Sequence, residues 1–342
     1  MAFTMQEMKV MLIVILCYSI HGDAEQIGVN YGMNGDNLPS AGEVVTLMKN
    51  NSIGKMRIFQ ADHEALQAFE NSSIDVIVGV GNTELQAVAS NQDSANGWVN
   101  DNIVPFYPAT NIKYIAVGNE VLVDNAQYAS YLVSAMNNIQ TAIESANLQN
   151  IKVSTPHATT VIGTAFPPSQ GTFSDSVKDT MNSVLQFLDA HGSPFMANVY
   201  PYFSYTGNEG TISLDYALFR STSPVVTDGD LSYTYLFDAM VDTLLSAMGS
   251  LGHGSLPIVI TESGWPSAGG DAATVENAQT YNNNLIKHVL SSAGTPKRPG
   301  TSIETYIFAL FNENLKTGDE IEKHFGLFNP NQQPVYPVNF SP

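Results

Sequence analysis

The sequence predicts an α/β protein built as a single (β/α)8 TIM barrel. Short apolar runs rich in β-branched residues alternate with longer amphipathic stretches, which is the pattern of βα units around a parallel sheet. The number of such runs is eight, the number of strands in a closed barrel. With 342 residues, 44% of them hydrophobic, one barrel takes up nearly the whole chain, so a second full domain is not expected.

The first 24 residues have the features of a secretory signal peptide, ahead of a barrel domain at 25–342. Lys9 precedes an apolar stretch at 10–16, and small residues at 22–24 provide a cleavage site. A membrane anchor is the alternative, but this stretch is far shorter than the roughly 20 residues that cross a bilayer. We therefore expect a secreted protein of the extracellular space or cell wall, with a vacuolar destination left open.

Cysteine use and glycosylation sequons agree with this route. The only cysteine, Cys17, lies within the predicted signal, so the mature protein is expected to have no disulfide. Sequons for N-glycosylation occur at Asn50, Asn71 and Asn339, as in a glycoprotein, although such sequons are also frequent by chance.

The expected strands and loops follow from local composition. The strands are expected at 27–31, 55–59, 75–80, 114–117, 152–155, 196–199, 258–261 and 305–308. The segment 126–146 is expected to be a helix of the outer ring, because its apolar residues recur at three- and four-residue steps. Segments 167–172 and 203–218 are rich in Gly, Ser, Pro and aromatic residues and are expected to be long loops where the strands exit.

The net charge excludes two classes of partner. A formal charge of −19 and an isoelectric point near 4.5 repel phosphate backbones and anionic lipid surfaces, so neither nucleic acid nor membrane is an expected partner. The seven histidines show no pair at metal-ligand spacing with acidic companions, and no metal is expected. An acidic protein of this kind is expected to be a monomer.

Two of the apolar runs deliver a glutamate at their end. One reads Tyr-Ile-Ala-Val-Gly-Asn-Glu and ends at Glu120; the other reads Pro-Ile-Val-Ile-Thr-Glu-Ser-Gly-Trp-Pro and carries Glu262. The carboxyl ends of barrel strands open on one face, so the two carboxylates are expected to meet. Two carboxyl groups about 5–5.5 Å apart, one protonated and one ionised, carry out retaining glycoside hydrolysis without a cofactor.

These segments, with Ile-Gly-Val-Asn-Tyr-Gly at 27–32 and Phe-Asn-Glu-Asn at 311–314, resemble plant endo-β-1,3-glucanases of glycoside hydrolase family seventeen. The resemblance runs from about residue 26 to 340 and implies a catalytic domain at 25–342. It implies that Glu120 is the proton donor and general acid–base, and that Glu262 is the nucleophile. The alternative roles are a salt-bridged loop carboxylate for Glu120 and a helix-capping carboxylate for Glu262.

Three supporting residues follow from the same resemblance. Asn119 is expected to donate a hydrogen bond to the sugar 2-hydroxyl, with a loop-capping role as the alternative. Glu313 and Lys316 lie in a segment similar to the family's second pair of site residues. A lysine close to the two carboxylates would help to keep Glu262 ionised; the alternative is a surface ion pair.

Aromatic residues gather at or just past the expected strand ends, where their faces suit the apolar surface of sugar rings. About half of them are expected to contact substrate: Tyr31, Phe59, Tyr200, Tyr202, Phe203, Trp265 and Phe311. His157 follows the fifth expected strand and is left out of the catalytic set, because a lone histidine is more often structural.

The chain departs from many relatives at two places: it reads Phe-Gln-Ala at 59–61 in place of Tyr-Asp-Pro, and Gly-Val-Gly-Asn at 79–82 in place of a proline-containing turn. The expected function is hydrolysis of internal 1,3-β-D-glucosidic linkages in callose or fungal-wall glucan, in plant defence or wall remodelling. The alternatives are a mixed-linkage 1,3;1,4-β-glucanase on the same scaffold, and a secreted glucan-binding protein of weakened catalysis.

Overall fold

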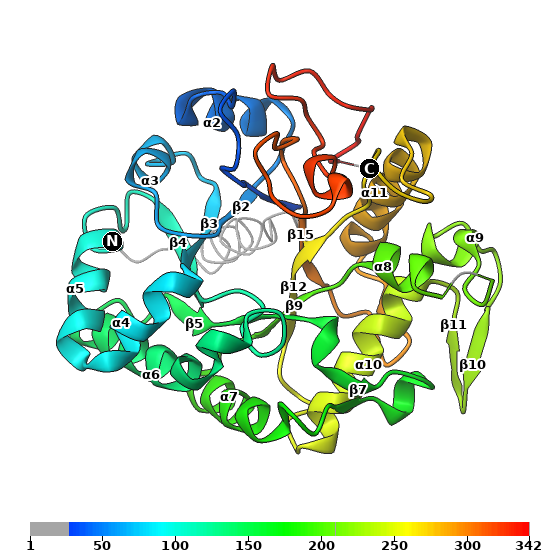
Figure 1. The fold of residues 1–342 in the computed structure, drawn as a ribbon, viewed down its shortest axis with the longest axis horizontal. Coiled ribbons are helices and arrows are strands. Elements are labelled where there is room, and N and C mark those ends of the chain that lie inside the picture. Colours follow the sequence, from blue (N-terminus) through cyan, green and yellow to red (C-terminus); the bar gives the residue numbers. More distant parts are fainter. Residues whose placement is uncertain (1–26, 209, 342) are drawn as a thin grey trace, which may run out of the picture.

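The computed structural model describes residues 27–208 and 210–341, and its strands surround a common centre with the helices outside them (Figure 1). The predicted signal peptide and its cysteine lie outside the described residues. The barrel strands are β1 (Gly28–Asn30), β2 (Lys55–Ile58), β3 (Asp75–Val80), β4 (Asn111–Val117), β5 (Lys152–Ser154), β6 (Pro156–Ala158), β9 (Phe195–Asn198), β12 (Ile258–Ser263) and β15 (Glu304–Ile307). Each of the eight expected strands is confirmed; the one expected at 152–155 is β5, and β6 is an additional short strand just beyond it.

Parallel pairing closes the sheet almost completely. The strand order is β5-β4-β3-β2-β1-β15-β12-β9-β6, so the two ends of the sheet are β5 and β6. Only Thr155 separates these two strands in the chain. Because β5 pairs with β4 and β6 pairs with β9, one stretch of backbone joins both ends of the sheet. The predicted (β/α)8 barrel is therefore confirmed.

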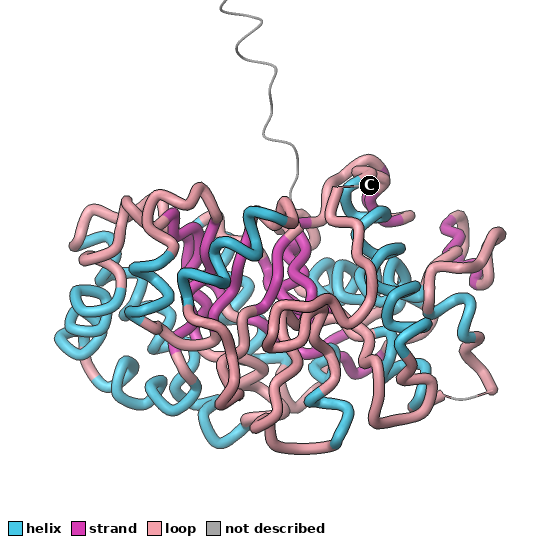
Figure 2. The backbone as a smooth tube through the Cα atoms, turned by 90° about the horizontal axis from the view of Figure 1, so that it is seen from above, coloured by secondary structure: helices cyan, strands magenta, loops and turns pink. Residues whose placement is uncertain are grey.

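Helices cover the outer surface of this barrel (Figure 2). Most strands are followed by a helix, and the outer apolar faces of both pack together. The helices are α2 (Ala41–Asn50), α3 (His63–Ala68), α4 (Leu85–Ser90), α5 (Gln92–Asn102), α6 (Leu132–Ser145), α7 (Lys178–His191), α8 (Pro201–Thr206), α9 (Leu214–Ala217), α10 (Leu236–Ser250) and α11 (Val275–Leu290). Among the described residues, none of these helices has the length and apolar character needed to cross a membrane.

The predicted helix at 126–146 is present as α6, preceded by a 3₁₀ turn at Ala126–Tyr131. Its buried residues include Leu132, Met136 and Ile139, which lie on the apolar face that the spacing indicates. The expectation of a long loop at 203–218 was wrong in part, because α8 and α9 occupy much of it. The α8 helix begins with Pro201 at its first position, a residue that is pre-organised for a helix start.

Short elements complete the described chain. Three hairpins lie outside the barrel: β7 (Ile162–Thr164) with β8 (Thr172–Phe173), β10 (Val226–Asp228) with β11 (Leu231–Tyr233), and β13 (Gly294–Thr295) with β14 (Arg298–Pro299). The remaining 3₁₀ turns are Asn82–Glu84, Thr159–Val161, Pro168–Gln170 and Glu320–Lys323. The predicted sequons at Asn50, Asn71 and Asn339 are all exposed, and their use stays a prediction.

The barrel interior is a packed core and not a pore. Below the carboxyl ends of the strands, a layer of almost completely buried residues fills the interior: Ile77, Ala116, Met196, Val259 and Tyr306. Above this layer, at the carboxyl ends of the strands, the inward-pointing residues become polar: Asn30, Arg57, Asn198 and Glu262 are buried there. Buried polar side chains are costly unless they are paired, so this change marks the end of the barrel where a site can form.

Candidate active site

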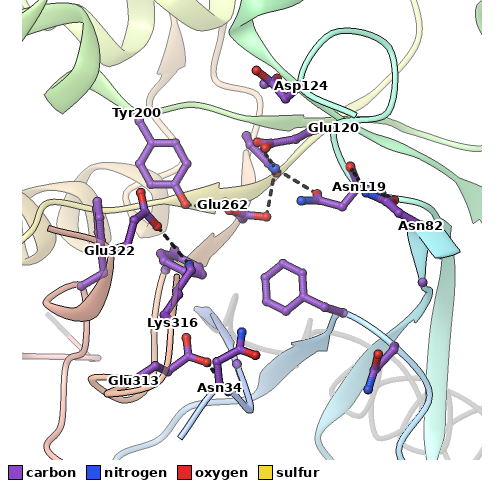
Figure 3. Close-up of a pocket in the computed structure, with 18 of the residues that line it drawn as sticks. Asn34, Asn82, Asn119, Glu120, Asp124, Tyr200, Glu262, Glu313, Lys316 and Glu322 are labelled. Atoms are coloured by element: carbon purple, nitrogen blue, oxygen red, sulfur yellow. Dashed lines mark hydrogen bonds and ion pairs between the residues drawn. The ribbon is translucent and has the colours of Figure 1, made fainter. Parts of the chain in front are cut away.

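A cleft of about 760 Å³ opens over the carboxyl ends of the strands (Figure 3). Its lining comes from the segments that follow β1, β2, β3, β4, β6, β9 and β15, together with Glu262 of β12. Both glutamates predicted from the sequence line it. In Figure 3, Glu120, Glu262 and Asn119 point toward one another, while Lys316 and Glu322 lie on another side of the cleft.

Glu120 owes its position to a sharp turn after β4. Gly118 has a φ of 70°, and a Cβ there would lie 2.5 Å from a methyl group of Val121, so only glycine fits. Glu120 itself has a φ of 52°, an uncommon backbone conformation for a residue with a side chain. Its backbone N–H donates to the carbonyl of Pro156 at 3.0 Å, which ties the turn to the next strand. The turn aims the carboxyl group into the cleft.

Asn198 at the end of β9 joins the two carboxyl groups. Its Nδ2 lies 2.8 Å from Oε1 of Glu120 and 2.9 Å from Oε1 of Glu262. These two oxygens are therefore no farther apart than the sum of the two hydrogen bonds. The hydroxyl of Thr261 donates to Oδ1 of Asn198 at 2.7 Å, which fixes the amide with its nitrogen toward the carboxylates. Sequence reasoning missed Asn198, although a polar residue at the end of an apolar run is a usable signal.

Arg57 is the second site residue that sequence reasoning missed. It lies within β2 and is 1% exposed, and its Nη1 donates to Oε1 of Glu262 at 2.7 Å. Its Nη2 donates to Oδ1 of Asn119 at 2.8 Å, so one guanidinium contacts segments after β4 and within β12. The signal was present: an arginine between Met56 and Ile58 in an apolar run requires a buried anion.

Asn119 lies in the cleft and its backbone is fixed. Asn82 accepts from the N–H of Asn119 at 2.7 Å and donates to its carbonyl at 2.9 Å, which replaces strand pairing beyond the end of β3. The side-chain Oδ1 of Asn119 accepts from Arg57 and Asn198. Both of these bonds use the oxygen, and the amide nitrogen of Asn119 has no partner among residues 27–208 and 210–341, so it can donate to a ligand in the cleft.

The two glutamates occupy different electrostatic surroundings. Burial raises the pKa of Glu120 to about 7, and the negative charge of Glu262 adds to the rise, while the hydrogen bond from Asn198 lowers it. Glu262 receives three donors: Arg57, Asn198 and the hydroxyl of Tyr200, which lies 2.7 Å from Oε2. Burial also raises the pKa of Tyr200 well above its usual value, so this hydroxyl keeps its proton and donates.

The prediction for Lys316 needs a correction. Lys316 and Glu313 both line the cleft, but the ammonium of Lys316 pairs with Glu322 at 3.2 Å and lies 3.9 Å from the ring centre of Phe308. The cation that contacts Glu262 is Arg57. Glu313 accepts from the backbone N–H of Asn34 at 2.7 Å, and burial raises its pKa.

The aromatic residues divide into two groups. Tyr31, Phe59, Tyr200 and Phe203 line the cleft as expected. Three others do not border it and are buried instead: Tyr202 (3% exposed), Trp265 (0%) and Phe311 (2%). The indole N–H of Trp265 donates to the carbonyl of Ala272, and Tyr202 packs edge-on against its ring. About half of the seven were expected to contact substrate; these three pack into the core, because position after a strand does not fix the direction of a side chain.

Phe308 and Phe325 line the cleft and were missed. They pack against each other and against Tyr200, which gives one side of the cleft a continuous aromatic surface. His157 lies behind the cleft: it is buried, it stacks on Phe195, and burial lowers its pKa to about 3. In the described part of the chain, no group of three or more His, Cys, Asp or Glu residues is arranged to hold a metal ion.

Comparison with known proteins agrees with this geometry. Residues 27–340 match the glycosyl hydrolases family 17. A glucan endo-1,3-beta-glucosidase of Vitis vinifera is 53% identical over 321 residues, 93% of this chain and 92% of that protein. A solved structure described as a beta-1,3-glucanase and allergen of Cryptomeria japonica pollen is 76% identical with a TM-score of 0.91, over 93% of this chain and 99% of that one.

A second solved structure, from work on two plant beta-glucan endohydrolases with distinct substrate specificities, is 44% identical. Its TM-score is 0.88, and the match covers 92% of this chain and 100% of that one. The TM-scores show that both structures share the overall fold of this chain. The family match spans every strand of the barrel and every residue that lines the cleft. The chain therefore belongs to the glycosyl hydrolases of family 17.

Proposed function

We propose that this protein is a secreted endo-hydrolase that cleaves internal 1,3-β-D-glucosidic linkages with retention of anomeric configuration. The observation that carries this proposal is the contact of Glu120 and Glu262 with one nitrogen of Asn198. Their Oε1 atoms are closer than the about 6.5–9.5 Å that inverting enzymes keep between carboxyl groups to admit a water molecule. The names of the similar proteins support 1,3-β-glucan as the substrate.

In the first step, Glu262 attacks the anomeric carbon and the glycosidic C–O bond breaks, with its electron pair leaving on the departing oxygen. Glu120 donates its proton to that oxygen, a role that suits a carboxyl group with a pKa of about 7. Arg57 and Tyr200 donate hydrogen bonds to Glu262 and so hold its carboxylate in position for the attack.

In the second step, Glu120 takes a proton from water, which attacks the anomeric carbon and releases Glu262. Between the two steps, Glu262 is bound to the sugar as an ester, which has no charge. The part of the rise in the pKa of Glu120 that comes from the charge of Glu262 is therefore absent at this stage. The pKa of Glu120 therefore falls between the two steps, and the same carboxyl group serves first as acid and then as base.

The amide nitrogen of Asn119 is placed to donate to the 2-hydroxyl of the sugar that reacts, where a hydrogen bond strengthens in the transition state. The aromatic side of the cleft suits the apolar surface of a long neutral glucan. The predicted signal peptide supports secretion, and a glucan of this linkage supports callose or fungal-wall polysaccharide as substrate and a role in defence or wall remodelling.

The test is release of reducing ends from a linear β-1,3-glucan by the mature protein, beside Glu120→Gln and Glu262→Gln. We expect activity in the wild type that falls by at least about 10³-fold in Glu262→Gln and about 10²–10⁴-fold in Glu120→Gln. Proton NMR of the first product should show the β anomer; an initial α anomer would exclude a retaining mechanism.

One further substrate and a binding measurement separate the alternatives. Activity on a mixed-linkage 1,3;1,4-β-glucan alone would make the protein an enzyme of different linkage preference. This substrate is included because one of the similar solved structures comes from work on two plant beta-glucan endohydrolases with distinct substrate specificities. Binding of glucan without any release of reducing ends would instead indicate a binding protein.

A further inference from the structure

The ring of Phe59 lies against the guanidinium of Arg57. The Cζ atom of Arg57 is 4.5 Å from the centre of this ring. The in-plane donors of the same guanidinium are directed at the site: Nη1 contacts Glu262 and the carbonyl of Thr261, and Nη2 contacts Asn119. The faces of a guanidinium form no hydrogen bonds, so an aromatic ring can cover one face without competing for its donors.

Phe59 separates this guanidinium from the cleft. Phe59 is half-buried and lines the cleft, whereas Arg57 is 1% exposed and does not line it. The Nε of Arg57 is buried without a hydrogen-bond partner among the described residues, so no polar side chain takes over this part of the group. Water that entered here would compete for the bonds to Glu262 and Asn119 and weaken them.

The position of Phe59 is fixed from two directions. Its ring packs edge-on against Phe308, with 6.2 Å between ring centres and 84° between planes. Its backbone carbonyl lies against Gly79 of β3, where a Cβ would be only 2.1 Å from the oxygen. The two places where the chain departs from many relatives, 59–61 and 79–82, are therefore in direct contact.

We propose that Phe59 is a positioning residue for the hydrolysis. Its ring covers one face of the Arg57 guanidinium, excludes cleft water from it, and so holds the donors of Arg57 on Glu262 and Asn119. This inference rests on the proposed function. The role needs the face of the ring and not a phenol hydroxyl, so the phenylalanine found here keeps it, and a tyrosine at this place would keep it as well.

Arginine NMR tests the contact without any use of catalysis. The chain has three arginines, Arg57, Arg220 and Arg298, so a sample with ¹⁵N-labelled arginine gives few side-chain signals. In the wild type we expect Arg57 protons shifted by the ring current and slow to exchange with water. In Phe59→Leu the shift should disappear and exchange should become at least about tenfold faster. Phe59→Tyr should keep both features.

The other two arginines are internal controls. Arg298 donates to the carbonyls of Leu256 and Gly254 at the opposite end of the barrel, and Arg220 pairs with Asp215. Unchanged signals from both show that the variant is folded. Phe166→Leu removes a phenylalanine that is 70% exposed and does not line the cleft, so it should leave Arg57 unchanged. Unchanged Arg57 signals in Phe59→Leu would overturn the proposal.

Kinetics on a linear β-1,3-glucan separate positioning from sugar binding. A positioning residue acts through Glu262, so kcat should fall by about tenfold in Phe59→Leu while KM stays within about twofold. Phe59→Tyr should keep kcat within about twofold of the wild type. A higher KM with unchanged kcat would mean that Phe59 only binds sugar, and would refute positioning.

Failure of the proposed function has a different signature. A wild-type protein that hydrolyses no glucan contradicts that function and with it the catalytic part of this inference. The arginine signals then decide on their own whether Phe59 covers Arg57. An altered Arg57 signal with no hydrolysis would retain the shielding contact and reject the reaction, and the two failures are thus distinguishable.

Discussion

Strand β2 carries two ion pairs that differ in almost every respect. Lys55, at its start, pairs with Glu304 at 3.1 Å, and these side chains are 21% and 22% exposed. Arg57, two residues on, pairs with Glu262 at 2.7 Å, and these side chains are 1% and 7% exposed. Both cations point into the barrel, because side chains two residues apart in a strand share a face. The pair at the start of β2, the lower pair, is partly exposed to water, whereas the pair near its carboxyl end, the upper pair, is almost fully buried.

The two pairs also differ in how their charges are matched. At the lower end, Glu304 accepts from the hydroxyls of Tyr114 and Tyr306, so one carboxylate meets one cation and two neutral donors. At the upper end, a single arginine contacts Glu262 while a second carboxyl group, Glu120, approaches through Asn198. Excess negative charge in a buried site destabilises the folded protein. It also raises the pKa of a nearby carboxyl group, as acid catalysis requires.

The largest difference between the two ends should appear on Arg57→Lys. A lysine keeps the charge but cannot donate to Glu262 and Asn119 at the same time, because it lacks the planar fork of arginine. We expect kcat/KM on β-1,3-glucan to fall about 10²-fold. The matched change at the lower end, Lys55→Arg, should leave kcat/KM within about twofold. Equal losses in both variants would remove the distinction between the ends.

Glu120→Gln should make the protein more stable at pH 8. The pKa of Glu120 is raised from 4.5 to about 7 in the folded protein, so its proton is bound more tightly there than in the unfolded chain. The free energy of unfolding therefore falls as the pH rises from about 4.5 to 7. A neutral side chain removes this cost, which is about 3 kcal/mol. Urea unfolding at pH 8 and pH 4 measures it, and the gain should be absent at pH 4.

The pH dependence of the reaction should show the same proton. Glu120 must be protonated to act as an acid, so kcat/KM should fall about tenfold per pH unit above pH 7. In Glu262→Gln the neighbouring charge is absent, and the pKa of Glu120 should fall from about 7. Carbon-13 NMR titration of Glu120 in both proteins measures this pKa. An unchanged pKa would show that the charge of Glu262 has no effect on Glu120.

The sequence alone predicted the strands and the meeting of Glu120 and Glu262 at one end of the barrel, for one physical reason. A run of β-branched residues that ends at a carboxylate specifies a buried strand and the edge at which it stops, as in Glu120 and Glu262. Parallel strands in a barrel must place these edges on one face. Parallel packing of these short apolar runs in one barrel therefore brings together Glu120 and Glu262, which are 142 positions apart in the sequence.

The direction and partners of single side chains were not accessible in the same way. Trp265 and Phe311 follow strands as Phe59 does, yet they turn into the core. The segment that follows each strand has its own backbone path, and only tertiary packing decides it. Arg57 was overlooked because it lies inside a strand and not at its end, although a buried cation in an apolar run has to be matched by an anion.

Tyr200→Phe tests the upper end by a smaller change. The ring and its contacts with Phe308 and Phe325 remain, and only the hydroxyl that donates to Oε2 of Glu262 is lost. One charge-assisted hydrogen bond in a buried site should cost about tenfold in kcat. KM should change little, because the aromatic surface is intact. A rise in KM alone would place the tyrosine in substrate binding.

Lys55→Gln should give the smallest effect, and it is the strictest test of the comparison. The pair with Glu304 is partly solvated, so its loss should lower the free energy of unfolding by less than about 1 kcal/mol. The tyrosine donors of Glu304 remain, so its carboxylate stays hydrogen-bonded. Activity should be unchanged within about twofold, since no cleft residue contacts either side chain of this pair among the described residues. A loss comparable to that in Arg57→Lys would mean that charge anywhere in the barrel interior controls the reaction, and burial beside a second carboxyl group would no longer explain the difference between the two ends of β2.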